Sequence, residues 1–454
     1  MGIFFDFINA NETLKYVDEH SEKEYSIHDL DLVEFEDPNK ELVFAYLDNS
    51  IQAIRWFWSI VKSKHVVVLL SENLDEKLKS TLEVNYLPKY IIDYKRDTIL
   101  NYEQSKQMGC FVKKMHNSVV INENIKLLLS TSGTTGSPKF VKLSETNILT
   151  NALDISQYLN IQNTDVVPLN LPIYYSYGLS ILTSNAVIGN RVVCSNTDIL
   201  NRLFWENLDR FKYSSLAGVP MVYEMLDRIG FRKKKYPSLR YITQAGGKLS
   251  NELILKFADY SFENNLNFYV MYGATEATAR MSYLEPSQIK NKLGSIGKPL
   301  KSGTFSINQE NGELQYCGPN VFGGYVESPT DLDSFDQSNC LNTGDIAQVD
   351  QDGFYFITGR IKRIVKLFGL RINLDEIEHY LSNELHSSIK CIGIDDKKIG
   401  VFYCDVDLNN SKINEILIGI FKLHISTIVI NRIDKYPVTL NGKTDYNELS
   451  RIIK

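Results

Sequence analysis

The stretch STSGTTGSPK, residues 130–139, combines small hydroxyl residues and glycines with a final lysine. It follows three consecutive leucines, Leu127, Leu128 and Leu129, a run typical of a strand buried on both faces. Glycines leave backbone N–H groups accessible, hydroxyls add donors, and an ammonium adds positive charge. The combination suits phosphate oxygens, although such loops are also common as ordinary connections between elements.

This loop does not follow the Walker A pattern, which requires a glycine, four residues and then Gly-Lys-Ser/Thr. Gly136 is followed by Ser137 and Pro138, and the Gly-Lys-Thr at residues 442–444 has Pro437 where the first glycine would stand. Any phosphate site here must therefore be of another kind. Its candidate contacts are Thr131, Ser132, Gly133, Thr134, Thr135, Gly136 and Lys139.

Strand-length apolar runs alternate with segments whose apolar residues recur at three- and four-residue spacing, the pattern of a parallel sheet covered by helices. The predicted strands are 65–71, 126–130, 165–172, 191–195, 213–220, 239–247 and 267–273. The predicted helices are 144–159, 200–210 and 251–262. Several strands end in loops rich in Gly, Ser, Thr or Pro, and such loops converge at the carboxyl edge of an α/β sheet.

The last third of the chain has a different texture. From about residue 294, short strands and turns predict an antiparallel segment. From about Lys362 the sequence predicts strand, helix, strand, helix, strand, as in a small separate domain.

Composition excludes several functional classes. A length of 454 residues predicts two or three domains, and a formal charge of -6 with scattered Lys and Arg argues against nucleic acid as the main partner. Six cysteines without CxxC spacing and seven histidines without an HxxxH pair indicate neither a zinc site nor a disulfide framework, which favours a reducing compartment. Asp6 lies where a signal peptide would be apolar, so we expect a cytoplasmic protein without a membrane span.

TSGTTGSPK resembles the signature of the adenylate-forming superfamily, which includes acyl-CoA synthetases, luciferases and nonribosomal-peptide adenylation domains. Further stretches resemble the motifs of that family in the same order, over roughly residues 127–445. They are LPIYYSYGL (171–179), QAGGKLS (244–250), MYGATEA (271–277), GELQYCGPNVFGGY (312–325), NTGDIAQVDQDGFYFITGRIKRIVKLFGLRIN (342–373) and PVTLNGKTD (437–445).

The resemblance implies an α/β fold with two domains. Residues 1–360 would form a large multi-sheet domain with a distorted β-barrel portion, and residues 361–454 a small mobile α+β domain. It also implies a reaction, in which a carboxylate and Mg²⁺-bound ATP give an acyl-adenylate and pyrophosphate. The acyl group then passes to a pantetheine thiol of coenzyme A or an acyl carrier protein, and the enzyme would be a monomer or homodimer.

The family's roles in the reaction can be carried onto matching residues. Lys443 would stabilise charge at the α-phosphorus, with Thr275 beside it, and Glu276 would hold Mg²⁺. Asp345 and Arg360 would bind the ribose. The remaining nucleotide contacts would be Gly246, Gly247, Lys248, Tyr272 and Gly273. In isolation each has an ordinary alternative, such as a solvated lysine, a turn glycine or a capping aspartate.

Three further assignments concern the small domain and the acid. Lys362 would be the hinge, and Gly369 would line the passage for the thiol. The acid pocket would include Tyr175, Tyr177, Gly218 and Arg280, where Arg280 is either a surface or structural arginine or a ligand for a second polar or anionic group.

The sequence departs from the family at three places. Phe140 replaces a frequent glycine, and Tyr175 stands where many members have a gating histidine. The stretch 174–177 lacks the aspartate that pairs with the ammonium of an amino-acid substrate, which favours an acid without an α-amino group. An amino-acid-activating enzyme and a non-catalytic nucleotide-binding protein remain the alternatives.

Overall fold

The computed structural model describes residues 2–115, 119–130, 139–367, 370–394, 397–438 and 444–453. The chain divides into two units. Unit 1 comprises Met1–Thr304 and Tyr316–Leu341, and unit 2 comprises Phe305–Gln315 and Asn342–Lys454. Residues 342–360 thus group with the C-terminal residues rather than with the predicted large domain. The predicted boundary at residue 360 is the point where a mobile domain would begin. The division into units does not address motion, so this boundary stays a prediction.

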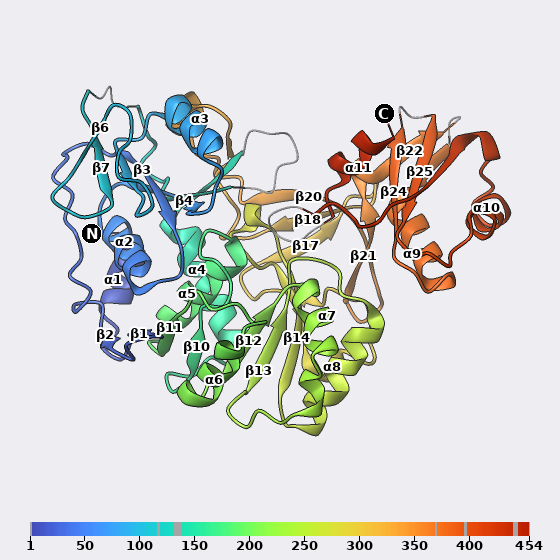
Figure 1. Cartoon of the computed structure of the whole chain (residues 1–454), viewed down its shortest axis with the longest axis horizontal. Coiled ribbons are helices and arrows are strands. Elements are labelled where there is room, and N and C mark those ends of the chain that lie inside the picture. The colour runs from blue at the N-terminus through green and yellow to red at the C-terminus, as the bar shows by residue number, and fades with distance from the viewer. Residues whose placement is uncertain are drawn as a thin grey trace. The chain divides into compact units, whose positions relative to one another are not determined.

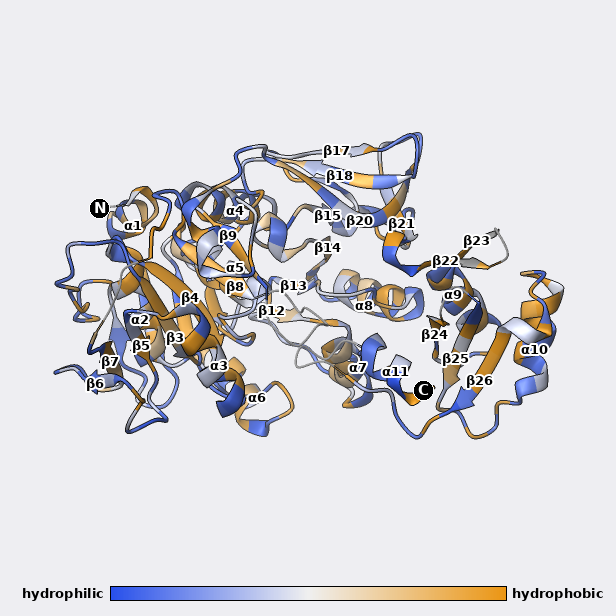
Figure 2. Cartoon of the chain, turned by 90° about the horizontal axis from the view of Figure 1, so that it is seen from above, coloured by the Kyte–Doolittle hydropathy of each residue, from blue (hydrophilic) through white to orange (hydrophobic). Residues whose placement is uncertain are grey.

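The largest sheet of unit 1 has eight strands in the order β19-β9-β8-β4-β3-β5-β7-β6. Figure 1 labels β4, β3, β7 and β6 of this sheet. Its central strands are parallel: β8 (Leu127–Ser130), β4 (Val66–Ser71), β3 (Leu42–Leu47) and β5 (Tyr90–Ile92). Alternate residues of β3 enter two different clusters of buried apolar side chains, because successive side chains point to opposite faces. These strands are therefore mostly apolar, and β3 and β4 are largely orange in Figure 2.

The edges of this sheet are antiparallel, so the predicted parallel sheet is in fact mixed. β9 (Phe140–Leu143) pairs antiparallel with β8 and with β19 (Tyr325–Val326). At the other edge, β7 (Cys110–Lys113) pairs antiparallel with β5 and with β6 (Tyr102–Gln104). The hairpin β8–β9 brings the two ends of the STSGTTGSPK stretch together, since Ser130 is in register with Phe140.

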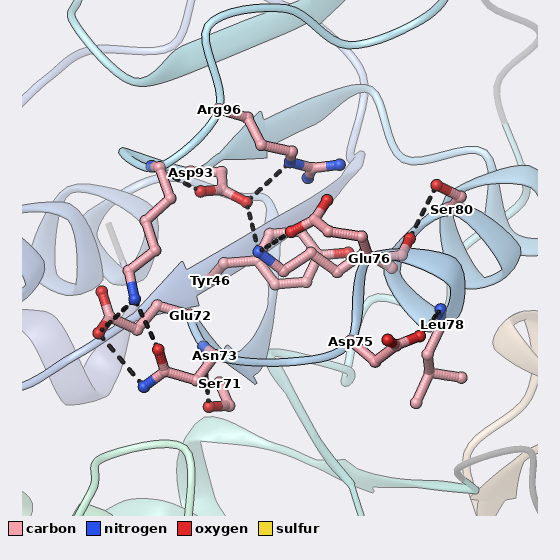
Figure 3. A network of polar contacts seen from close by, with 12 residues as sticks. Tyr46, Ser71, Glu72, Asn73, Asp75, Glu76, Leu78, Ser80, Asp93 and Arg96 are labelled. Carbon is pink, nitrogen blue, oxygen red and sulfur yellow. Dashed lines mark hydrogen bonds and ion pairs between the residues drawn. The ribbon is translucent and has the colours of Figure 1, made fainter.

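No motif predicted the place of the first hundred residues. In the structure they supply β3, β4 and β5 of this sheet and two of its helices, α2 (Ile51–Lys62) and α3 (Glu76–Tyr86). An ionic network is buried where α3 approaches the ends of β3 and β5 (Figure 3). The Lys79 Nζ lies 3.0 Å from Asp93 Oδ2, and Arg96 Nε lies 2.8 Å from the same oxygen.

A five-stranded sheet carries most of the predicted site loops. Strands β12 (Ser215–Gly218), β13 (Tyr241–Gln244) and β14 (Asn267–Tyr272) are parallel, and β15 (Ser282–Leu284) and β16 (Lys298–Pro299) continue the sheet antiparallel. Helices α7 (Pro220–Arg228) and α8 (Asn251–Glu263) pack against each other beside it (Figure 1).

The remaining sheet of unit 1 has the strand order β10-β11-β1-β2. Its bounds are β10 (Val166–Pro168), β11 (Arg191–Cys194), β1 (Lys15–Asp18) and β2 (Glu24–Tyr25). The helices not yet given are α1 (Ile3–Asn9), α4 (Glu145–Tyr158), α5 (Ser176–Ala186) and α6 (Arg202–Phe211). The seven strands and three helices predicted above are all present, with shifted ends. Within the described ranges, no helix has the length and apolar character needed to cross a bilayer.

The predicted antiparallel segment is confirmed as the sheet β17-β18-β20-β21. Its bounds are β17 (Thr304–Ile307), β18 (Glu313–Cys317), β20 (Cys340–Val349) and β21 (Tyr355–Arg360). Within unit 1, Cys317 and Cys340 form a disulfide. The sequence indicated no disulfide, because two cysteines 23 residues apart carry no local signature and meet only when β18 and β20 are placed.

The C-terminal part contains more strands than predicted, because two of the expected single strands are hairpins. The hairpin β22 (Ile364–Leu367) and β23 (Leu370–Asn373) precedes α9 (Leu374–Glu384). The hairpin β24 (Ile389–Ile394) and β25 (Lys398–Tyr403) is followed by α10 (Asn410–Gly419), β26 (Ile428–Arg432) and α11 (Tyr446–Ile452). The predicted fold class, α/β with several sheets, one of them curled as a half-barrel, is confirmed.

Candidate active site

The loop predicted to bind phosphate lies in the β8–β9 hairpin. Thr131, Ser132, Gly133, Thr134, Thr135 and Gly136 fall outside the described residues. Lys139, directly before β9, forms an ion pair with Glu327 and lies 5.9 Å from the ring centroid of Tyr325. Because β19 pairs with β9, the strand pairing delivers Tyr325 and Glu327 to this lysine.

Thr275 and Glu276 begin a short 3-10 turn that follows β14. The backbone doubles back here so closely that a Cβ on Gly273 would lie 1.8 Å from the carbonyl oxygen of Ala279, which explains the glycine. The hydroxyls of Thr275 and Ser176 lie 3.2 Å apart. The Tyr325 hydroxyl donates to Glu276 Oε1 at 2.9 Å. Burial, together with the charge of Glu276, raises the pKa of Tyr325, so the phenol stays protonated and keeps donating.

A buried asparagine that the sequence did not single out holds this turn in place. Asn320 donates to the carbonyl oxygens of Ala277 at 2.9 Å and Arg280 at 3.1 Å, and it accepts from the Tyr316 hydroxyl. Thr278, with φ of +64°, adopts a backbone conformation that is costly for a β-branched residue, and its hydroxyl donates to the Asn320 carbonyl. A strained turn held by a buried amide fixes the position of Thr275 and Glu276.

Gly246 and Gly247 lie directly after β13, close to the start of α5. Gly246 has φ of +84°, and a Cβ there would lie 2.6 Å from the Tyr175 hydroxyl. Burial raises the pKa of Tyr175, so this phenol stays neutral. Tyr272, at the end of β14, is half-buried, and Lys248 is exposed.

The residues predicted to contact the acid lie between α5 and the five-stranded sheet. The Tyr177 hydroxyl contacts Thr243, with 3.0 Å to its carbonyl oxygen and 2.8 Å to its hydroxyl. The Arg280 guanidinium lies over the Tyr177 ring, 4.5 Å from the centroid. Gly218 ends β12 and leaves room for the Tyr223 ring, since a Cβ would lie 2.9 Å from it.

In unit 2, the two residues predicted to bind ribose lie together. Asp345 and Arg360 are opposite each other in the antiparallel pair β20–β21, and Arg360 Nε donates to Asp345 Oδ1 at 2.9 Å. Lys362 is exposed in the 3-10 turn that follows β21. Whether it acts as a hinge stays a prediction.

Lys443 and Gly369 lie outside the described residues. The chain on either side of the Lys443 segment is nevertheless anchored, because Val438 pairs with Thr444 in a β-bridge. The Tyr446 hydroxyl donates to Glu378 at 3.0 Å, and the Arg363 guanidinium lies 4.0 Å from the Tyr446 ring centroid.

The protein groups around Glu276 would fit Mg²⁺ only if phosphate oxygens supplied further ligands. In the part of the chain that the structure describes, no group of three or more His, Cys, Asp or Glu side chains could hold a metal ion. A single carboxylate completed by phosphate oxygens and water is a usual arrangement for Mg²⁺.

Comparisons with known proteins identify the family of the chain. Residues 41–326 match the family model described as AMP-binding enzyme. Oxalate–CoA ligase of Arabidopsis thaliana is 26% identical over 72% of this chain and 65% of that protein. The 2-succinylbenzoate–CoA ligases of Staphylococcus epidermidis and Bacillus pumilus are 29% and 30% identical, over 71% and 64% of this chain and 68% and 60% of those proteins. The matched region thus spans about two thirds of these relatives.

Two solved structures share the fold along nearly the whole chain. The o-succinylbenzoate CoA synthetase of Bacillus subtilis, in complex with its acyl-adenylate intermediate, has a TM-score of 0.77 at 19% identity and covers 99% of this chain and 98% of that one. ATP-bound MatB of Rhodopseudomonas palustris has a TM-score of 0.76 at 17% identity, with the same coverage. The predicted resemblance is confirmed: with more than half of its residues matched to the family model, the chain belongs to the AMP-binding enzymes.

Proposed function

We propose that the chain is an ATP-dependent acid–thiol ligase, which activates a carboxylic acid as an acyl-adenylate and transfers the acyl group to coenzyme A. The observation that carries the proposal is that Thr275 contacts Ser176 and Glu276 contacts Tyr325, while Gly246 lies beside Tyr175, the residue before Ser176. Membership of the AMP-binding family supports it.

In the first half-reaction, a carboxylate oxygen of the acid attacks the α-phosphorus of ATP and pyrophosphate leaves. Thr275 would donate its hydroxyl hydrogen to an α-phosphate oxygen, which it can do while Ser176 donates to Thr275. Glu276, held by Tyr325, would bind Mg²⁺, which supplies positive charge to the phosphate oxygens when bound. Lys443 would stabilise the negative charge that develops at the α-phosphorus, and Asp345 would accept the ribose hydroxyls.

In the second half-reaction, a thiolate attacks the acyl carbonyl carbon and AMP leaves. Coenzyme A is the proposed thiol because the curated relatives reported above are CoA ligases. Coenzyme A and ATP are cytoplasmic, so we place the reaction there. The Cys317–Cys340 bond is the observation that points instead to an oxidising compartment.

An amino-acid substrate is disfavoured by the charge that faces the acid pocket. An α-ammonium group needs a carboxylate partner, whereas the charged group beside Tyr177 is the Arg280 guanidinium. Two positive charges close together in a poorly solvated pocket repel strongly. The acid is therefore proposed to lack an α-amino group.

The proposal is tested by carboxylate-dependent exchange of labelled pyrophosphate into ATP over a panel of acids, followed by thioester formation with coenzyme A or with a phosphopantetheinylated carrier protein. We expect exchange with a non-amino acid and a thioester with coenzyme A. Exchange confined to amino acids would overturn the substrate assignment, and transfer to the carrier alone would overturn the acceptor.

A Lys443→Ala variant separates a ligase from a nucleotide-binding protein without chemistry. Exchange should fall by orders of magnitude while ATP still binds, because the lysine would act on the transition state rather than on the ground state. Lys435→Ala, which removes an exposed lysine of the same region, is the matched control. If the wild type binds ATP and is inert with every acid, the binding-protein alternative stands.

A further inference from the structure

Arg280 is a buried cation without a carboxylate partner among the residues that the structure describes. Only 2% of its surface is exposed. Its Nη1 donates to the Tyr158 hydroxyl at 2.9 Å, and its Nη2 donates to the Ser180 hydroxyl at 3.0 Å. Its Nε has no hydrogen-bond partner in the part of the chain that the structure describes. The partners of this guanidinium are thus neutral hydroxyls, an aromatic ring and the sulfur of Met271.

Other arginines with little exposure in this chain are paired differently. Arg363 contacts both Asp375 and Glu378, and Arg96 contacts both Glu83 and Asp93. Leaving a cation out of water without a counter-ion costs several kcal/mol, so buried charges are ordinarily paired. Arg280 alone among these three offers a buried positive charge to an anion that the protein does not supply.

This charge borders a cavity beside the acid pocket. The cavity has a volume of about 20 Å³ and is bounded by α5, β12 and β13. Its polar lining comprises Asn170, Ser184, Asn185, Ser215, Thr243 and Arg280. A space of this size holds one or two small polar groups and no long chain. Its donors suit the oxygens of an anion such as a carboxylate.

We propose that Arg280 binds a second anionic group of the acid substrate, so that the enzyme activates a short dicarboxylic acid. The inference rests on the proposed ligase function. Along α5, Ser176 contacts Thr275 and Ser180 contacts Arg280, and four residues of helix rise about 6 Å. The second carboxylate would therefore lie about one helical turn beyond the carboxylate that is activated, which corresponds to a spacer of a few carbons.

The experiment compares matched acids and matched arginine variants. Pyrophosphate exchange is measured with succinate, glutarate and adipate, and with butyrate, pentanoate and hexanoate of the same chain lengths. The variants are Arg280→Met, which keeps much of the shape without the charge, and Arg240→Met, which removes an arginine that directly precedes β13 and is paired with Asp165. Thermal unfolding of each protein is recorded with and without each acid, without ATP.

For the wild type we expect the kcat/KM of the best dicarboxylate to exceed that of its monocarboxylate by at least about 30-fold, and Arg280→Met to remove this ratio. A dicarboxylate should also raise the Tm of the wild type and not that of Arg280→Met. Arg240→Met should lower the Tm and leave the ratio intact.

Two results would overturn the inference and leave the ligase function intact. In the first, the wild type is active and has equal kcat/KM for dicarboxylates and monocarboxylates. In the second, the ratio of the two kcat/KM values is the same in Arg280→Met as in the wild type. If no acid supports exchange, the ligase proposal fails. The Tm shifts then decide whether Arg280 binds a dicarboxylate at all.

Discussion

Asn320 offers a direct test of how the turn that carries Thr275 and Glu276 is held. Its side chain is fully buried and makes three hydrogen bonds, two of them donated to backbone carbonyls of the turn. Asn320→Ala removes all three. At about 0.5–1.5 kcal/mol net for each bond, with a further cost for the space left behind, unit 1 should lose about 2–5 kcal/mol of unfolding free energy.

The volume-matched variant Asn320→Asp separates hydrogen bonding from packing. It keeps the shape and an acceptor for Tyr316, but it places carboxylate oxygens against the carbonyls of Ala277 and Arg280. We therefore expect Asp to destabilise at least as much as Ala, although it fills the same space. Asn73→Ala, which removes an exposed asparagine, should change the free energy by less than about 0.5 kcal/mol.

Urea unfolding followed by tryptophan fluorescence suits this measurement, because all three tryptophans, Trp56, Trp58 and Trp205, lie in unit 1. Pyrophosphate exchange measured at 25 °C, far from unfolding, should fall at least tenfold in both Asn320 variants, since the turn positions Thr275. If Asn320→Asp barely changed the unfolding free energy and kept normal exchange, the reasoning would be refuted. Filling the space would then be enough to hold the turn without the donated hydrogen bonds.

Three further outcomes follow from buried groups elsewhere. Asp93→Asn should lower the unfolding free energy by about 3–5 kcal/mol in urea, because it leaves Lys79 and Arg96 buried with less negative charge (Figure 3). Glu76→Gln, which changes an exposed partner of Lys79, should lower it by less than about 1 kcal/mol, and equal effects of the two variants would contradict this reasoning. Burial lowers the pKa of His65 to about 4, and its Nδ1 accepts from the Glu41 N–H, so the neutral form is favoured in the folded state. The unfolded chain binds the proton first, so stability should fall as the pH drops from about 6.5 to 4. Urea unfolding at several pH values should show that His65→Gln removes at most about 3 kcal/mol of this pH dependence, and an unchanged pH dependence in the variant would contradict the assignment. Cys317→Ser should lower the unfolding free energy by about 3 kcal/mol, because the disulfide joins residues 23 apart in the sequence. Thiol titration of the unfolded wild type should find four thiols without reductant and six with it, and six thiols in both conditions would show that the bond does not form.

Elements with a strong local pattern were predictable. The apolar runs of β4, β8 and β14 and the periodic segments of α4 and α8 identify themselves because strand and helix side chains repeat every two and every 3.6 residues. Gly246 was also predictable as a turn glycine after a strand, and it has a positive φ; the close backbone approach at Gly273 depends on the turn to Ala279 and was not predictable.

Partners across long sequence separations were not predictable. Asn320 has no motif around it, and it becomes important only because β18 and the following loop bring it beneath the turn after β14. The disulfide and the ionic network around Asp93 depend in the same way on residues that meet only after strands pair.

The sequence by itself determined the family and the strands and helices with a strong local pattern, and it nominated loops for the chemistry, because these depend on local spacing and residue type. Only the tertiary structure decided that the strand after Lys139, β9, runs antiparallel to β8 and that Tyr325 donates to Glu276. It also decided that Arg280 is buried and has no counter-ion among the described residues, whereas the sequence left open whether this arginine lies at the surface or in a pocket. The physical reason is that burial and charge pairing are properties of side chains from distant segments, and no single segment encodes them.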